Sequence, residues 1–249
     1  MNSSQPSGNM PDHRIDLFPE IAARIAQRRG QAAIYPHFVP ARTAMVVVDM
    51  QNCWLEAGQP GYSPHCLPLV PRINALAQAL RGAGGTVCWV QMNGSREVSA
   101  AWPRYRDFFA REEVFDAWSD ALTPGNPGYE LWHGLDVQPQ DMRAAKSRYS
   151  AFIQGACDLH ERLAGRGIDT VLIAGTATNV CCEASARDAQ MLNYKVAILA
   201  DGCATRSDAE HNASLSNLFG MFADVVTVAE AIGRLQPPDR TTADPRGGA

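Results

Sequence analysis

Two continuous apolar runs constrain the fold of this chain more than any other feature of its sequence. Residues 44–49 read AMVVVD, and residues 170–175 read TVLIAG. Strands that are apolar at every position are typical of parallel sheets covered on both faces, because successive side chains enter two different cores. We therefore expect an α/β domain with helices on both sides of a buried sheet.

The rest of the chain alternates between extended and helical patterns. Further strands are expected over residues 86–91, 141–146, 195–199 and 224–228. Helices are expected over residues 70–80, 155–164, 180–192 and 208–222, with a short one ending near residue 235. Such alternation predicts βαβ units with right-handed crossovers. The predicted fold is three-layer α/β and Rossmann-like, with a six-stranded, mostly parallel sheet flanked by helices, over residues 39–236.

Three segments lie outside this pattern. Residues 1–38 form an N-terminal extension, in which residues 16–29 predict an amphipathic helix that packs on the domain or on a neighbouring subunit. Residues 237–249 are rich in Pro, Gly and charge and predict a disordered tail. The stretch 93–140 is long and irregular and carries three tryptophans. Long insertions of this kind are commonly lids or subunit contacts, and both alternatives stay open.

Composition excludes several classes of protein. The 249 residues carry a net charge of −4, so no basic excess favours nucleic acid. No apolar run approaches the roughly 18 residues of a membrane span, and the polar N-terminus lacks the apolar core of a signal peptide. The seven cysteines form no CxxC pair, which favours reduced thiols. We expect a cytoplasmic protein that binds neither nucleic acid nor membrane.

Three residues of chemical interest stand at the ends of predicted strands, where open α/β sheets bind their ligands. Asp49 follows five apolar residues, and a carboxylate there is unfavourable unless it is used or paired. Lys146 ends the strand over residues 141–146. Cys181 follows the clearest strand of the chain. A capping residue or a solvated lysine would explain the first two singly, but all three are expected at one edge of the sheet.

The surroundings of Cys181 favour a reactive thiol. Thr178 or Asn179 can cap the next helix, which places Cys181 in its first turn. The helix dipole and the free N–H groups there stabilise a thiolate. Cys182 points about 100° around the helix and is assigned to packing. A thiolate, a carboxylate and an ammonium can together activate a nucleophile and move a proton.

Three short motifs carry a family resemblance. They are VVDMQN at residues 47–52, KSRYSAF at residues 146–152, and GTATNVCCE at residues 175–183 with ARDA at residues 186–189. In this order and spacing they resemble the isochorismatase-like cysteine hydrolase superfamily, over about residues 40–234. The resemblance implies a six-stranded parallel sheet and a catalytic triad of Asp49, Lys146 and Cys181. It also implies a cis peptide between Thr176 and Ala177, and an oxyanion hole made by the N–H groups of Ala177 and Cys181.

The resemblance further implies a mechanism and an assembly. Asp49 accepts the thiol proton, Lys146 stabilises the charged pair, and Cys181 attacks a carbonyl carbon. A thioester forms, Asp49 protonates the leaving nitrogen, and water then hydrolyses the thioester. Members of the family commonly form dimers or tetramers, so we expect a homo-oligomer.

The motifs also indicate a branch of the family. Metal-dependent nicotinamidases carry an Asp-x-His pair after the first strand, whereas residues 52–60 have none and His65 stands alone. We therefore expect no metal and no cofactor. The TNVCCE and KxRYS segments look most similar to ureidoacrylate and N-carbamoyl amidohydrolases. They imply cleavage of a C–N bond in a small ureido, N-carbamoyl or carboxamide substrate, with release of ammonia.

Substrate contacts and rival functions complete the expectations. Asn93 follows the second strand, and Arg96, Glu97 or Arg148 could meet a polar or charged substrate. Tyr149 either lines the pocket or supports Lys146. Two rival functions stay open at this point, an ether or ester hydrolase that needs no cysteine and a catalytically silent interaction protein.

Overall fold

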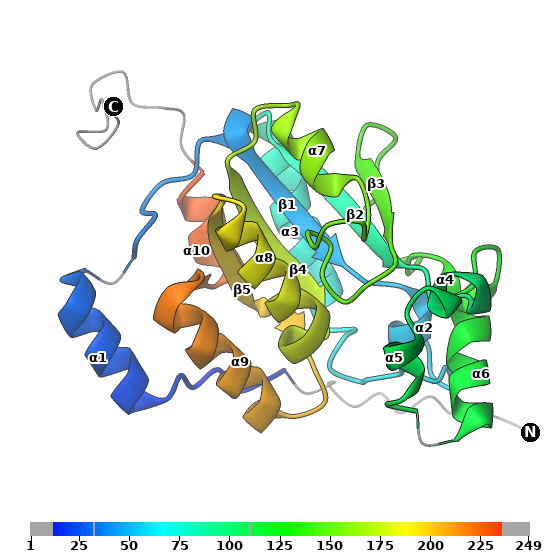
Figure 1. Ribbon diagram of the computed structural model, residues 1–249. Helices are drawn as coiled ribbons and strands as arrows, with labels where there is room; N and C mark the ends of the chain where they lie inside the picture. Colours follow the sequence, from blue (N-terminus) through cyan, green and yellow to red (C-terminus); the bar gives the residue numbers. More distant parts are fainter. Residues whose placement is uncertain (1–11, 32, 110, 236–249) are drawn as a thin grey trace, which may run out of the picture.

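Six strands form the central sheet of the computed structural model, which describes residues 12–31, 33–109 and 111–235 (Figure 1). The sheet order is β3-β2-β1-β4-β5-β6, and every strand pairing in the sheet is parallel. The strands are β1 (Thr43–Val48), β2 (Thr86–Met92), β3 (Met142–Lys146), β4 (Thr170–Thr176), β5 (Lys195–Ala204) and β6 (Asp224–Val226). The predicted three-layer α/β fold with a six-stranded parallel sheet is confirmed.

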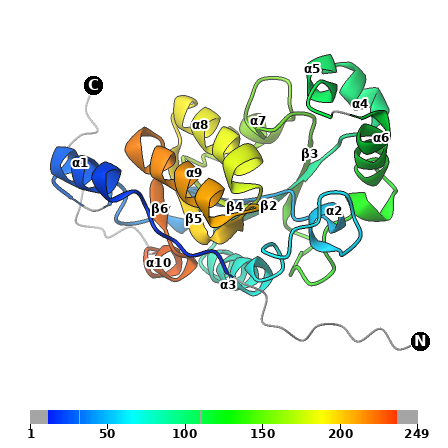
Figure 2. The ribbon, with the colours of Figure 1, turned by 90° about the horizontal axis from the view of Figure 1, so that it is seen from below.

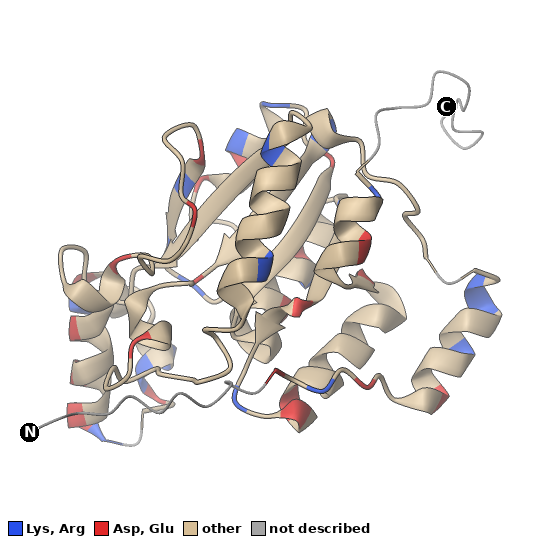
Figure 3. Ribbon diagram, turned by 180° about the vertical axis from the view of Figure 1, so that it is seen from behind, with Lys and Arg blue, Asp and Glu red and all other residues tan. Residues whose placement is uncertain are grey.

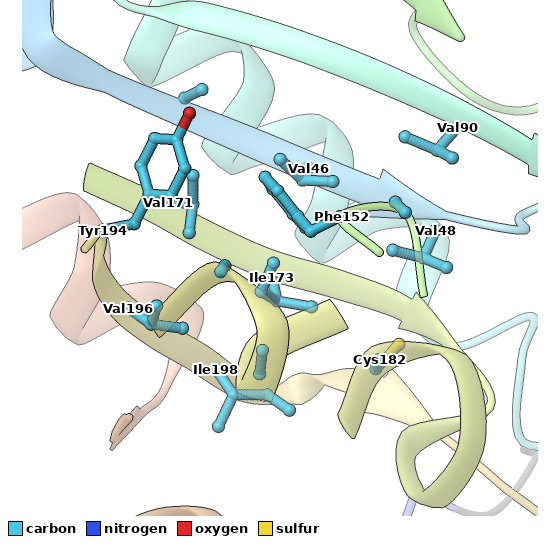
Figure 4. Packing of buried hydrophobic residues seen from close by; sticks show 14 of the residues in the cluster. Val46, Val48, Val90, Phe152, Val171, Ile173, Cys182, Tyr194, Val196 and Ile198 are labelled. Atoms are coloured by element: carbon cyan, nitrogen blue, oxygen red, sulfur yellow. The ribbon is translucent and has the colours of Figure 1, made fainter. Parts of the chain in front are cut away.

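Strand β1 lies at the centre of the sheet and is completely buried. Its side chains alternate between two cores, as the pleat of a strand requires. Ala44, Val46 and Val48 pack into one core, shown in part in Figure 4. Met45 and Val47 pack into the other. The continuous apolar run at residues 44–48 therefore reflects burial on both faces of the sheet.

Helices cover both faces, as Figure 2 shows from below. One face carries α3 (Leu69–Gly82) and α10 (Val228–Gly233). The other carries α7 (Leu159–Ala164), α8 (Glu183–Met191) and α9 (Asp208–Met221). Charged residues of both signs are interspersed over the helices and loops around the sheet (Figure 3). Within the described residues, no helix combines the length and apolar character needed to cross a membrane.

Several element boundaries differ from the sequence-based expectations. Strand β5 continues to Ala204, five residues beyond the predicted end, and resumes its pairing with β4 after a register shift between Ile173 and Gly175. Helix α7 begins only at Leu159, because Gly155 adopts a positive φ in the preceding turn. The helix expected from residue 180 begins as a π-helical turn, Thr178–Cys182.

The stretch 93–140 is more regular than predicted. It contains α4 (Arg96–Ala100), α5 (Pro103–Arg106), α6 (Glu112–Ala121) and a 3₁₀ turn (Pro127–Tyr129). These short helices gather at one end of the molecule, near α2 (Asn52–Leu55) (Figure 1). Local capping explains part of this order, because the hydroxyl of Ser95 accepts a hydrogen bond from the N–H of Val98 and starts α4.

The N-terminal extension packs on the domain of its own chain. Helix α1 (Pro19–Arg29) begins three residues later than predicted, at a proline suited to a first helical position, and it lies beside α9 (Figure 1). Before it, the chain runs along α9, where the N–H groups of Asp16 and Phe18 donate to Asn212 and Ser216. The predicted tail at residues 237–249 lies outside the described residues.

Candidate active site

The ends of three strands bring Asp49, Lys146 and Cys181 together. Asp49 follows β1, Lys146 is the last residue of β3, and Cys181 lies in the turn after β4. The Lys146 ammonium Nζ lies 2.8 Å from Asp49 Oδ2 and 3.5 Å from Cys181 Sγ. The sequence-based expectation that these residues share one edge of the sheet is therefore confirmed as geometry.

Lys146 is fully buried, and its three ammonium protons have partners close by. Besides Asp49 and Cys181, the ammonium donates to the Arg148 backbone oxygen at 3.1 Å. Asp49 is also fully buried. A buried cation of this kind requires a paired anion and good hydrogen-bond geometry. The arrangement places one positive charge beside both a carboxylate and a sulfur atom.

Burial dominates the proton affinities at this site. It raises the pKa of the Cys181 thiol to about 12, although the Lys146 ammonium opposes the shift. Burial also raises the pKa of the Asp49 carboxyl, again against the influence of Lys146. For Lys146, burial alone would lower the pKa, but Asp49 and Cys181 raise it on balance. Burial therefore favours the neutral thiol, which opposes the stabilised thiolate expected from the sequence.

Hydrogen bonds from α9 and from the residue after β5 hold the turn that contains Cys181. Neither Thr178 nor Asn179 caps the following helix, contrary to expectation. Instead, the Thr178 hydroxyl pairs with His211 Nδ1 at 2.9 Å, and Asn179 Oδ1 accepts a hydrogen bond from the Thr205 hydroxyl at 2.6 Å. The peptide bond between Thr176 and Ala177 is cis, at the position that the family resemblance implies.

Cys181 opens into a pocket of about 210 Å³. Asp49 and Lys146 lie behind it and do not line this space, so the sulfur is the group of the three that a ligand can reach. Thr176 and Ala177 line the pocket beside Cys181. The remaining lining residues are Trp54, Gly61, Ser63, Met92, Tyr105, Phe109, Trp118, Tyr149, Val180, Thr205 and Arg206.

Of the five expected substrate contacts, the structure places only Tyr149 at this pocket. Asn93, Arg96 and Glu97 line a separate hollow, and Arg96 forms an ion pair with Asp116 at 2.5 Å. In the turn before α4, Asn93 Oδ1 accepts a hydrogen bond from the Ser95 N–H.

Arg148 also has other partners. Its guanidinium lies 5.2 Å from the centre of the Trp102 ring and donates to two backbone oxygens, those of Ser147 and Ala101. This side chain fastens the loop after β3 to the insertion and does not line the pocket of Cys181.

Arg206 is a pocket residue that sequence reasoning missed. Its exposed side chain lines the pocket, and among the described residues it forms no ion pair and no side-chain hydrogen bond. The rule that ligands bind beyond the carboxyl ends of strands could have found it, since β5 ends at Ala204. The predicted strand stopped at residue 199, which placed Arg206 too far from the edge of the sheet.

The described residues contain no group of three or more His, Cys, Asp or Glu side chains that could hold a metal ion. Next to the pocket, three histidine rings instead stack on one another. His13 lies 4.3 Å from His65 and 4.5 Å from His211, measured between ring centres. His13 also accepts a hydrogen bond from the N–H of Thr205, which connects the N-terminal extension to a pocket-lining residue.

Comparison with known proteins identifies the family of this chain. The isochorismatase domain model matches residues 43–230. Ureidoacrylate amidohydrolase RutB of Methylobacterium radiotolerans is 30% identical over 212 residues, which cover 78% of this chain and 81% of the relative. The same enzyme of Caulobacter vibrioides is 32% identical over 220 residues, covering 80% and 94%. A cysteine hydrolase from Pseudomonas syringae pv. phaseolicola superposes with a TM-score of 0.73 at 31% identity, covering 82% of this chain and 96% of that structure.

The fold and the buried Asp–Lys–Cys constellation define a three-layer α/β protein with a cysteine at its pocket. The chain belongs to the isochorismatase family. At the level of the family it is a hydrolase, and its curated relatives are amidohydrolases by name.

Proposed function

We propose that this enzyme cleaves the C–N bond of a small ureido, N-carbamoyl or carboxamide substrate through a thioester on Cys181, with release of ammonia. The proposal rests mainly on one observation: the buried ammonium of Lys146 contacts both Asp49 and Cys181. Of these three residues, only Cys181 lines the adjacent pocket. The ureidoacrylate amidohydrolases among the relatives support the substrate class.

The proton affinities support general-base activation of the thiol. Because the pKa of Cys181 is about 12, the thiol attacks a carbonyl carbon efficiently only if a base accepts its proton as the S–C bond forms. Asp49 is the base in this proposal, since it is a carboxylate held beside the ammonium of Lys146. Lys146 stabilises the negative charge that passes between sulfur and carboxylate.

The rest of the reaction uses the same groups. The N–H groups of Ala177 and Cys181 are the proposed donors to the oxyanion, and both residues line the pocket. When the C–N bond breaks, Asp49 returns its proton to the leaving nitrogen. Water then attacks the thioester while Asp49 takes a proton from it, and the Cys181 thiol is restored. No step requires a metal or a cofactor.

Arg206 and the polar edge of the pocket support a substrate that carries a carboxylate. Arg206 is the sole cationic side chain among the lining residues, and within the described residues it has no anionic partner of its own. A guanidinium can bind a carboxylate through two parallel hydrogen bonds. Ureido acids have both the carbonyl group that Cys181 needs and an anion for Arg206.

The homo-oligomer and the cytoplasmic location stay predictions.

The test is ammonia release from a panel of ureido, N-carbamoyl and carboxamide acids, with enzyme treated beforehand with chelator. We expect release by the wild type and none by Cys181→Ala. The matched control is Cys182→Ala, because Cys182 is fully buried and lies outside the pocket lining. It should keep its activity.

Two outcomes would contradict the proposal. Equal turnover by the wild type and Cys181→Ala would favour an ether or ester hydrolase that needs no thiol. No turnover of any compound, by a wild type that is folded and monodisperse, would favour a silent scaffold. Mass spectrometry of enzyme quenched during turnover should show the substrate acyl group on the peptide that contains Cys181.

A further inference from the structure

Five aromatic side chains form a continuous wall of the pocket. They come from α2, from the insertion after β2 and from the loop after β3, and they are Trp54, Tyr105, Phe109, Trp118 and Tyr149. We call this set the aromatic wall. Segments far apart in the sequence therefore converge on the pocket of Cys181.

Neighbouring rings of the aromatic wall pack edge to face. Trp54 and Trp118 lie 6.0 Å apart between ring centres, and Trp118 and Phe109 also lie 6.0 Å apart. Phe109 and Tyr105 lie 5.0 Å apart, and Tyr105 and Tyr149 lie 5.9 Å apart. The interplanar angles of these four pairs range from 62° to 74°. Such T-shaped pairs are a preferred arrangement of aromatic rings, and an added ring can extend the series.

The aromatic wall is not simply part of the protein core. Four of its five rings are only partly buried, and Tyr105 alone is almost fully enclosed. The part of the wall that other side chains leave open faces the pocket, whose volume is about 210 Å³. An apolar cavity of about 150 Å³ is large enough to bind benzene. The pocket therefore has room for one six-membered ring together with a ureido group.

Outside the aromatic wall, the pocket lining includes several polar groups. The hydroxyl-bearing Ser63, Thr176 and Thr205 and the cation Arg206 line it together with Cys181. A compact ureido acid would use these groups and leave the aromatic wall in contact with water. A substrate with a ring would cover the wall and gain the free energy of burying apolar surface.

We infer that the substrate is a ureido acid that carries an aromatic ring close to its ureido group. The inference rests on the proposed function, because it assumes that Cys181 attacks a ureido carbonyl. The ring lies against the aromatic wall, the carbonyl carbon lies at Cys181 Sγ, and the carboxylate meets Arg206. The aromatic wall then selects the substrate, while the buried triad performs the chemistry.

The experiment compares N-carbamoylphenylalanine with N-carbamoylalanine, which differ by one phenyl group, using both enantiomers of each. We expect kcat/KM to be roughly 10- to 100-fold higher for the better phenyl enantiomer than for either alanine compound, as burial of that ring allows. Phe109→Ala should remove most of this preference. Phe108→Ala is the matched control, because the adjacent Phe108 is 83% exposed and lies outside the pocket lining.

Binding to the Cys181→Ala enzyme, measured by titration calorimetry, separates this inference from the proposed function. If neither compound is hydrolysed by the wild type yet the phenyl compound binds Cys181→Ala at least 10-fold more tightly, the proposed chemistry fails and the ring preference stands. If the alanine compound is hydrolysed or bound as well as the phenyl compound, the inference is overturned. A ring preference that is unchanged in Phe109→Ala would also overturn it.

Discussion

Gly175 is the position where a single added methyl group tests the geometry of the site most directly. Its φ is +113°, and a Cβ built there would lie 2.0 Å from the backbone oxygen of Val48. Ordinary contact begins near 3.4 Å, so the two strands would have to separate by roughly 1.4 Å, the difference between the two distances. Val48 is the residue immediately before Asp49, so this movement displaces the carboxylate.

Gly175→Ala is therefore expected to lower both stability and activity. Backbone strain at such a φ costs about 1–3 kcal/mol, and overpacking costs about the same again, which together give roughly 4 kcal/mol. For a domain of this length that loss corresponds to a fall in Tm of about 10 °C. Displacement of Asp49 by about 1 Å should reduce kcat/KM by about 100-fold.

The assays are thermal and urea unfolding, with kcat/KM on the best substrate of the panel. Gly82→Ala is the matched control, because Gly82 lies at the end of α3 with no atom within 4 Å of the added Cβ. It should be neutral or stabilising by about 0.5–1 kcal/mol. A Gly175→Ala protein with wild-type Tm and wild-type kcat/KM would refute the reasoning, because the close approach of β1 and β4 would then not constrain the site.

Further predictions concern the buried charges and the histidines. Lys146→Met leaves Asp49 buried without its cation, so kcat should fall below detection. The free energy of unfolding, measured with urea, should fall by roughly 3–5 kcal/mol at neutral pH, and by less at acid pH, where Asp49 takes up a proton. In the wild type, kcat/KM should fall as the pH drops through the raised pKa of Asp49, so the acid limb of the pH profile should lie above the ordinary range of a carboxyl group. A limb at the ordinary carboxyl value would contradict the role of burial. Burial lowers the pKa of His211 from 6.5 to about 4, so the folded protein favours the neutral imidazole. The free energy of unfolding should therefore fall by up to about 3 kcal/mol as the pH drops from 6.5 to 4, and His211→Gln should flatten this pH dependence. His13→Ala should raise KM several-fold with little change in kcat, because His13 holds the backbone of Thr205, whereas replacing the exposed His37 should leave both constants unchanged.

The placement of the three proposed catalytic residues could be predicted from the sequence because it depends on local signals. Asp49 comes directly after β1, Lys146 ends β3 and Cys181 lies in the turn after β4, and parallel strands necessarily present their carboxyl ends at one edge. The protonation state of Cys181 could not be predicted in this way. The position in a first helical turn favours a thiolate, but burial opposes it and raises the pKa to about 12.

The walls of the pocket could not be predicted, because they depend on contacts between distant segments. Trp118 lies in α6 and Phe109 in the segment between α5 and α6, and their packing over Cys181 follows from the whole insertion. Arg206 was missed because β5 continues five residues beyond its last strongly apolar position. Arg96 was chosen as a loop arginine near the second strand, yet it pairs with Asp116 on α6, away from the pocket.

The residues that could be predicted lie at the edge of the sheet, whereas those that could not lie in the segments around it. The three proposed catalytic residues lie at the carboxyl ends of β1 and β3 and in the turn after β4, so the buried sheet positions them. The groups that select the substrate are attached to the insertion and to the loop after β5, which reach the pocket from outside the sheet. One contact comes from still further away, because His13 precedes the matched family domain at residues 43–230 and yet holds Thr205 at the pocket. Changes in these segments can therefore alter the preferred substrate while the triad keeps its geometry. For this reason substrate specificity is inferred from the aromatic wall and Arg206, and not from the triad alone.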